Sequence, residues 1–123
     1  MEFDNSKPIY LQIVDKIKKR LIRNELNIGD KIPSQRELAQ QLKVNPNTVQ
    51  RAYNEMETMG MVKTLRGQGT FICDKPEMLE EIKEDMVEDI MVRFFHDIKS
   101  LGYEDEEVKD LINKWQIKLE GEK

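Results

Sequence analysis

The spacing of apolar residues divides the chain into segments with helical and strand-like periods. Between Pro8 and about Asn24 they recur every three or four residues, which predicts a helix with one buried stripe. That stripe comprises Ile9, Tyr10, Ile13, Val14, Ile17 and Leu21. Pro8 suits the start of a helix because it has no backbone N–H to satisfy and its φ is already helical.

A second helix is expected after the turn-rich segment "NIGDKIPS". Ser34 and Glu37 have the spacing of a capping box, in which each residue bonds the backbone N–H of the other. The helix should run from there to about Leu42 and bury Leu38, Ala39 and Leu42.

The segment "KVNPNT" interrupts this pattern and starts a third helix. Asn45 can cap it, Pro46 fits its first turn, and Gly60 ends it after about Met59. Two short helices joined by a turn of a few residues have the spacing of a helix-turn-helix.

Beyond Gly60 the period becomes that of β-strands. The runs "MVKTL" and "TFICD" flank "RGQG", which predicts a small hairpin. After Pro76 the helical period returns in two segments separated by Gly102. Their stripes are Leu79, Ile82, Met86, Ile90, Phe94, Ile98 and Leu101, and then Val108, Leu111, Ile112, Trp115 and Leu119. The sequence therefore predicts a mainly α fold with a small β-hairpin, divided into residues 1–76 and a two-helix extension over residues 77–123.

Charge is distributed unevenly between these two parts. The chain of 123 residues carries a net charge of -4. Residues 1–76 hold 13 basic and 9 acidic side chains, a net +4, whereas residues 77–123 hold 7 and 15, a net -8. Only the front part is therefore suited to face a polyanion such as DNA.

The third helix has two chemically different faces. Val49, Ala52, Tyr53, Met56 and Met59 fall on one side and form its predicted core contact. The opposite side carries Asn47, Gln50, Arg51, Asn54 and Thr58, with Thr48 on its flank. Amides and guanidinium groups can make paired hydrogen bonds to base edges, and the first turns of a recognition helix enter the major groove. The alternative is an ordinary solvated face.

Two further segments are candidates for contact with nucleic acid. Arg36, early in the second helix, can point toward the same groove or pair with Glu37 or another carboxylate. In "RGQG", Gly67 and Gly69 allow a tight tip beside Arg66. That tip can touch a phosphate or the minor groove, or the glycines can serve the turn geometry alone.

Several classes of function are disfavoured by what the chain lacks. His96 and Cys73 are the only histidine and cysteine, which does not supply a metal site or an acid–base pair for an enzyme. A single cysteine allows no internal disulfide, and no membrane span or secretory signal is recognisable, so a reducing cytoplasm is the expected location.

Five blocks in order resemble the winged helix-turn-helix domain of GntR-family bacterial transcriptional regulators. They are "IPSQRELA", "VNPNTVQRAY", "EMETMGMV", "RGQG" and "TFI", within a resemblance that spans residues 8–73. Length and the wording of the second block are most similar to the short YtrA-like subfamily. The resemblance implies a homodimer on a two-fold operator, and no cofactor is expected. It also implies DNA contacts by Arg36, Asn47, Thr48 and the tip from Arg66 to Gly69.

Together, the helix face and the resemblance give one set of candidate DNA-binding residues. They are Arg36, Asn45, Asn47, Thr48, Gln50, Arg51, Asn54, Arg66, Gly67, Gln68 and Gly69. The expected function is sequence-specific regulation, as a repressor, of the chain's own operon, and the resemblance suggests a transporter operon. The alternative is a winged-helix module that binds protein instead of DNA.

The 47 residues after Pro76 are too few for the large ligand-binding domain of longer relatives, so dimerisation is their expected use. The candidate interface residues are Leu79, Ile82, Met86, Ile90, Phe94, Ile98, Leu111 and Trp115. Trp115 and the aromatics of "RFF" can instead line a pocket for an unidentified small-molecule effector.

Overall fold

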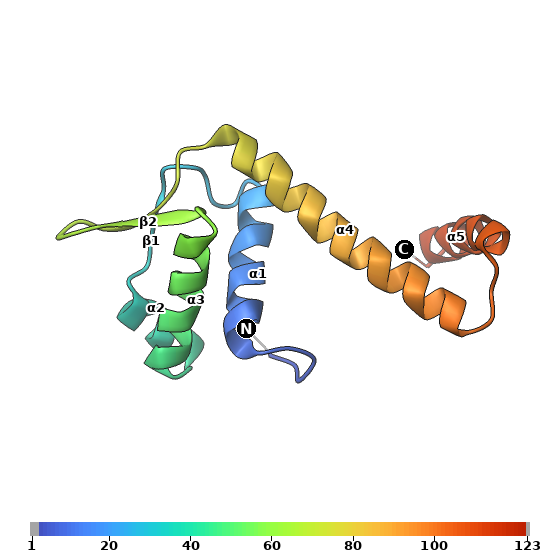
Figure 1. Cartoon of the computed structure of the whole chain (residues 1–123), viewed down its shortest axis with the longest axis horizontal. Coiled ribbons are helices and arrows are strands. Elements are labelled where there is room, and N and C mark those ends of the chain that lie inside the picture. Colours follow the sequence, from blue (N-terminus) through green and yellow to red (C-terminus); the bar gives the residue numbers. More distant parts are fainter. Residues whose placement is uncertain (1–2, 123) are drawn as a thin grey trace. The chain divides into compact units, whose positions relative to one another are not determined.

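The computed structural model describes residues 3–122 and contains five helices and three strands in that range (Figure 1). In chain order they are α1 (Ile9–Ile22), β1 (Lys31–Ile32), α2 (Gln35–Leu42), α3 (Pro46–Thr58), β2 (Val62–Leu65), β3 (Gly69–Ile72), α4 (Pro76–Ser100) and α5 (Asp105–Glu120). The chain forms two compact units, one up to Lys83 and one from Glu84 onward. The division between the units therefore falls inside α4.

Helix α1 buries the predicted stripe except at its start. Ile13, Val14 and Leu21 are buried, whereas Ile9 is exposed and Pro8 precedes the helix with an extended ψ of 144°. The buried set also includes Gln12. Its Nε2 donates to the carbonyls of Asp4 and Lys7 at 2.9 and 2.7 Å, and its Oε1 accepts from the Asp4 N–H at 3.1 Å. Because all its polar groups are paired, this amide can be buried, and it ties the preceding segment to α1.

Helix α2 begins with the predicted capping box. The Ser34 hydroxyl accepts from the Glu37 N–H, and the Glu37 carboxylate accepts from the Ser34 N–H, both at 3.1 Å. The backbone hydrogen bond from Ser34 lowers the pKa of the Glu37 carboxyl, because it favours the ionised form. Ala39 is buried, while Leu38 and Leu42 are half-buried.

Helix α3 packs on both α1 and α2, with Val49, Ala52 and Met56 completely buried. The Tyr53 hydroxyl donates to the carbonyl of Pro33, which fixes the connector before α2 against α3. The prediction that Met59 joins this core is wrong. It is 43% exposed because α3 ends at Thr58 and Met59 lies at the C-terminal cap.

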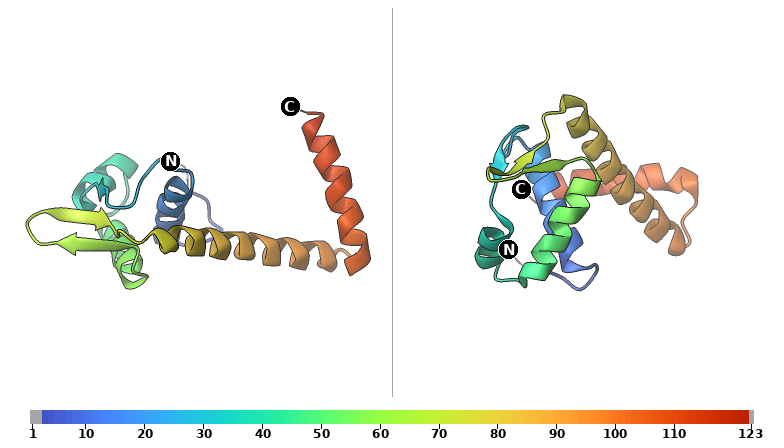
Figure 2. Two further views of the ribbon diagram at one scale, coloured as in Figure 1. Left: turned by 90° about the horizontal axis from the view of Figure 1, so that it is seen from above. Right: turned by 60° about the vertical axis from the view of Figure 1, so that its left-hand side comes forward.

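The predicted hairpin is part of a three-stranded antiparallel sheet in the order β1-β3-β2. Lys31 pairs with Phe71 and Lys63 pairs with Phe71 from the other side, so these three share one face. The opposite face buries Ile32, Val62, Thr70 and Ile72 against the helices. The β2–β3 hairpin extends past the helices of the first unit with its tip free (Figure 2). The first unit is thus a three-helix core with a projecting wing.

The second unit consists of the later turns of α4 and of α5. Among residues 84–122, Val108 alone is buried, although several apolar side chains lie between the two helices. Lys99 and Asp105 form an exposed ion pair at 2.6 Å beside the turn that joins the helices. No helix in the described part of the chain is long and apolar enough to cross a bilayer.

Candidate nucleic-acid interface

The polar face of α3, defined as Asn47, Gln50, Arg51, Asn54 and Thr58, is exposed along its whole length. Thr48 on its flank is half-buried. Apart from Met59 at the C-terminal cap, the opposite side is buried, so none of these polar groups is needed for the core. The predicted division of α3 into a core side and an exposed polar side is confirmed.

Asn45 is the N-cap of α3, where the polar face begins. Its Oδ1 accepts a hydrogen bond from the Asn47 N–H at 2.8 Å, which caps α3 as predicted. The amide nitrogen of Asn45 stays available for another partner. The cap therefore fixes the start of α3 relative to the loop that joins it to α2.

Arg51 lies at the edge of the polar face nearest α1. Its guanidinium carbon is 4.0 Å from the centre of the Tyr10 ring, close enough for a cation–π contact. Tyr10 belongs to the predicted α1 stripe and is half-buried. The structure therefore places Arg51 against an aromatic ring, a contact that the separate helical patterns do not reveal.

Arg36 projects from the first turn of α2 and is exposed. Its neighbour Glu37 is occupied by the capping box with Ser34. Within residues 3–122, Arg36 has no carboxylate partner closer than 4.0 Å. The alternative in which Arg36 pairs with Glu37 is therefore not what the structure shows.

The tip of the wing depends on its two glycines. Gly67 and Gly69 have φ values of 78° and 123°, which residues with a side chain rarely adopt, and the Gln68 N–H donates to the Leu65 carbonyl at 2.9 Å. A Cβ on Gly69 would lie only 2.6 Å from Cε of Lys31. The flexible end of Lys31, a cation from β1 that the sequence did not single out, thus lies beside Gly69.

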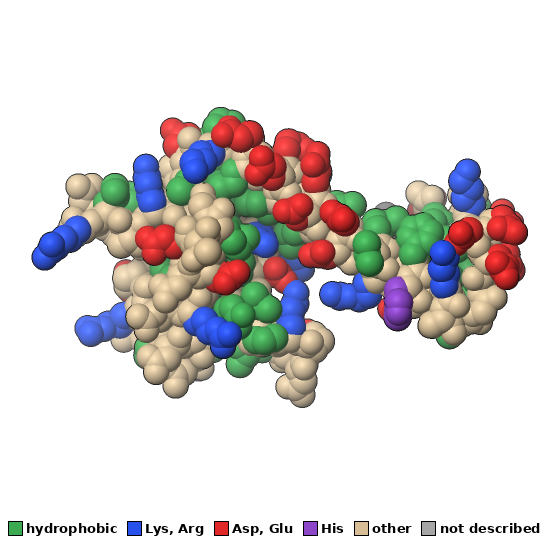
Figure 3. All heavy atoms as spheres, viewed as in Figure 1, with side chains coloured by type: hydrophobic (Ala, Val, Ile, Leu, Met, Phe, Trp, Pro, Cys, Tyr) green, Lys and Arg blue, Asp and Glu red, His purple; other side chains and the backbone are tan. Residues whose placement is uncertain are grey.

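Basic side chains project at the tip of the wing, and acidic side chains gather along α4 (Figure 3). Exposed cations without paired anions favour contact with a polyanion, whereas an acidic surface disfavours it. The wing and the polar face of α3 are therefore the parts of the first unit that suit DNA.

A family comparison matches the part of the chain that builds this surface. The sequence profile described as "Bacterial regulatory proteins, gntR family" matches residues 9–72, just over half of the chain. That range begins with α1 and ends with β3. The chain belongs to the GntR family. It is a DNA-binding transcriptional regulator and not an enzyme, as the sequence predicted.

Relatives of similar length extend the match beyond the first unit. The chain is 53% identical to the HTH-type transcriptional regulator YhcF of Bacillus subtilis strain 168, covering 87% of this chain and 88% of YhcF. It is 37% identical to the HTH-type transcriptional repressor YtrA of the same strain, covering 97% and 92%. These relatives confirm the predicted resemblance to YtrA-type GntR regulators.

Solved structures agree with the winged-helix fold. A GntR family transcriptional regulator from Listeria monocytogenes is 37% identical, with a TM-score of 0.82 over 91% of this chain and 98% of that one. The DNA-binding domain of AraR in complex with operator ORX1 is 26% identical, with a TM-score of 0.54 over 58% of this chain and 93% of that one. The part of the GntR chain that carries the candidate residues is thus similar to a domain solved on DNA.

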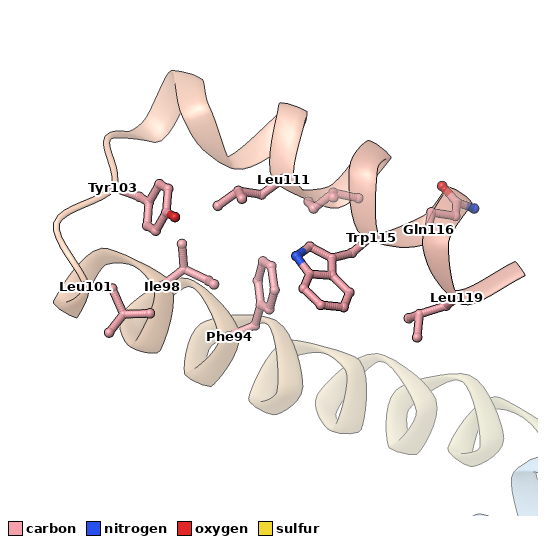
Figure 4. A pocket seen from close by; sticks show the side chains of 9 residues that line it. Phe94, Ile98, Leu101, Tyr103, Leu111, Trp115, Gln116 and Leu119 are labelled. Atoms are coloured by element: carbon pink, nitrogen blue, oxygen red, sulfur yellow. The ribbon is translucent and has the colours of Figure 1, made fainter. Parts of the chain in front are cut away.

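The second unit contains an apolar groove of about 580 Å³. Phe94 and Ile98 of α4 and Leu111 and Trp115 of α5 point into the space between the helices (Figure 4). The structure therefore brings together four of the predicted interface residues. Ile82, a fifth, is already buried within its own chain and cannot belong to an exposed stripe.

Proposed function

We propose that this GntR-family regulator is a repressor that binds a two-fold operator as a homodimer. Residues 1–76 act as the DNA-binding domain and residues 77–123 as the dimerisation extension. The observation that carries the proposal is the exposed polar face of α3, whose side chains take no part in the core. Its amides have the donor and acceptor pairs that base edges require. Arg36 at the start of α2 and Arg66 at the tip of the wing are exposed and have no ion-pair partner among the described residues.

The second unit supports pairing of two chains. A helical hairpin in which Val108 alone is buried among residues 84–122 has too little core to hold its two helices together. Trp115 is 47% exposed and Ile90 is 61% exposed on the faces that carry the predicted stripes. A second copy of the chain offers the same apolar surface, and a two-fold pairing covers both.

The target is proposed to be the promoter of the chain's own operon, and the resemblance to the YtrA-like subfamily favours a transporter operon. Repression then follows from exclusion of polymerase by a bound dimer. A small apolar effector is an alternative occupant of the groove lined by Phe94 and Trp115. Such an effector would release or tighten the dimer by binding one of its states more strongly.

DNA binding is tested by titrating the protein against its own promoter fragment at several salt concentrations. We expect specific binding whose affinity falls steeply with salt, because bound lysines and arginines release counterions from the phosphates. A reporter gene behind the same promoter should be more active without the protein. Absence of binding to any upstream fragment at low salt would favour the protein-interaction module instead.

The dimer is tested with two equally exposed residues of α4. Ile90 and Val92 are 61% and 62% exposed, but they lie on roughly opposite sides, since two residues turn a helix by about 200°. Ile90→Glu should produce a monomer in sedimentation experiments and weaken operator binding, whereas Val92→Glu should remain dimeric. If both variants sediment as the wild type does, the interface lies elsewhere.

A further inference from the structure

The contact between Arg51 and Tyr10 joins two helices at the edge of the proposed DNA surface. Arg51 is exposed on α3, Tyr10 is half-buried on α1, and the guanidinium carbon lies 4.0 Å from the ring centre. We infer that Tyr10 is a positioning residue that holds the Arg51 guanidinium ready to bind a DNA phosphate. This inference rests on the proposed operator binding and assigns Arg51 to the backbone of the duplex instead of to a base.

The position of the Arg51 guanidinium over the Tyr10 ring is compatible with free donors on Arg51. A guanidinium contacts an aromatic ring through its flat face, while its five N–H donors point outward in the plane. A phosphate binds those in-plane donors, often two at once. Tyr10 and a phosphate can therefore hold Arg51 at the same time.

No acidic side chain competes for this arginine among the described residues. Glu55 lies one turn further along α3, yet it forms no ion pair with Arg51 within 4.0 Å. An arginine without a carboxylate partner keeps its full charge available for an anion. Contact with the ring already restricts the rotamers of Arg51 in the free protein, so less conformational entropy is lost when DNA binds.

Position on the helix separates Arg51 from the base-reading candidates. At about 100° per residue, Arg51 is turned by about 40° from Asn47 toward α1, whereas Gln50 is turned to the other side. Contact with Tyr10 draws the guanidinium further toward α1. Phosphates border the groove that a recognition helix enters, and base edges form its floor, so the edge of the helix meets the backbone.

A phosphate contact, a base contact and a positioning contact change DNA affinity in different ways when they are removed. Loss of a phosphate contact weakens every sequence alike and lowers the slope of log affinity against log salt by about 1. Loss of a base contact removes discrimination at one base pair. Loss of an exposed cation–π contact should reduce affinity by only about two- to fivefold, and only while Arg51 is present.

The experiment uses the full chain and the duplex that the wild type selects most strongly from a random-sequence pool. Affinities for that duplex and for its single-base variants are measured with Arg51→Ala, Tyr10→Leu, the double variant and Tyr10→Phe. We expect Arg51→Ala to weaken all duplexes by a similar factor of about ten. Tyr10→Leu should add nothing in the Arg51→Ala background, and Tyr10→Phe, which keeps the ring, should match the wild type.

Three results would overturn the inference while leaving the proposed function intact. They are a loss of preference at one base pair in Arg51→Ala, an equal effect of Tyr10→Leu in both backgrounds, and a Tyr10→Phe defect as large as that of Tyr10→Leu. Concentrations refer to binding-competent protein determined by stoichiometric titration, and Tyr10→Met replaces Tyr10→Leu if the latter does not fold. A wild type that selects no duplex would refute the proposed function itself.

Discussion

Substitutions of Asn45 can separate the folding of α3 from its proposed approach to DNA. Asn45 caps the helix through a 2.8 Å hydrogen bond from the Asn47 N–H to its Oδ1. Asn45→Asp keeps an oxygen acceptor at this place and adds one negative charge. Asn45→Ala removes the acceptor and adds no charge. Asn45→Ala should therefore lose stability, whereas Asn45→Asp should stay stable and lose affinity for DNA.

The magnitudes follow from the cap and from Coulomb's law. Loss of an N-terminal cap in Asn45→Ala should lower the free energy of unfolding by about 1 kcal/mol. Asn45→Asp should stay within about 0.5 kcal/mol of the wild type or exceed it, because the carboxylate caps equally well and faces the positive end of the helix dipole. A phosphate about 4 Å from that carboxylate would be repelled by about 1 kcal/mol in water, which weakens operator binding at least about fivefold.

Urea unfolding gives the stabilities, and fluorescence anisotropy with the selected duplex gives the affinities at two salt concentrations. Asn113→Asp is the matched control, because it makes the same change of charge on the exposed surface of α5. At equal concentrations of folded protein, Asn45→Asp should bind more weakly than Asn45→Ala, and raised salt should reduce the difference.

The reasoning is refuted if Asn45→Asp binds the duplex as tightly as Asn113→Asp does, with the same dependence on salt. That result would mean that the N-terminus of α3 does not approach the phosphates. Strong destabilisation of Asn45→Asp would instead contradict the account of the cap.

Three other predictions concern the wing, the link between α2 and α3, and Arg36. Gly69→Ala should lower the free energy of unfolding by about 1 to 3 kcal/mol, because it strains a φ of 123°, while the flexible, exposed end of Lys31 can move aside. Urea titration should show the same loss when Lys31→Ala is also present, and an unchanged stability of Gly69→Ala would contradict the strain. Tyr53→Phe should lose about 1 kcal/mol with the hydrogen bond to Pro33. Burial raises the pKa of the Tyr53 hydroxyl to about 12 from its ordinary value near 10. The Tyr53 contribution to stability is therefore present below about pH 10 and lost as pH rises toward 12, and Tyr53→Phe should show less of this decline in alkaline urea titrations. Arg36→Ala should leave thermal stability unchanged, since the arginine has no ion-pair partner in the described chain, but should weaken operator binding by about 1 to 3 kcal/mol if it contacts a base. Anisotropy titration showing an unaltered affinity would remove Arg36 from the interface.

Much of the first unit follows from local signals. The capping box of Ser34 and Glu37, the Asn45 cap and the alternation of Val49 and Met56 with polar positions each involve residues within one helical turn or two. Such signals depend only on residues that are close together in the sequence, so they can be recognised without knowing the fold. The boundaries of α2 and α3 were therefore predicted to within a residue or two.

Strand β1 was not predicted because it contains only Lys31 and Ile32, too short for an alternating pattern. Its place is decided by pairing with β3, which is distant in sequence. The same holds for the contact between Tyr10 and Arg51 and for the close approach of the Lys31 side chain to Gly69. Each joins separate elements, and neither local period nor composition specifies which elements will meet.

The second unit shows where stripes of apolar residues are ambiguous. Ile82 and Ile90 belong to one predicted stripe, yet the first is buried and the second is 61% exposed. Periodicity identifies the side of a helix that is apolar. It does not say whether that side is covered by the same chain or by another molecule.

Val108, the one buried side chain among residues 84–122, has a consequence for how the cell controls this regulator. If α4 and α5 become stable by pairing with a second copy of the chain, the dimer that binds DNA forms by mass action. Below the dissociation constant of the dimer, its concentration varies with the square of the chain concentration, so halving expression lowers the dimer concentration about fourfold. Promoter occupancy then responds steeply to the rate of synthesis and to dilution by growth, and the chain acts as a gauge of its own abundance.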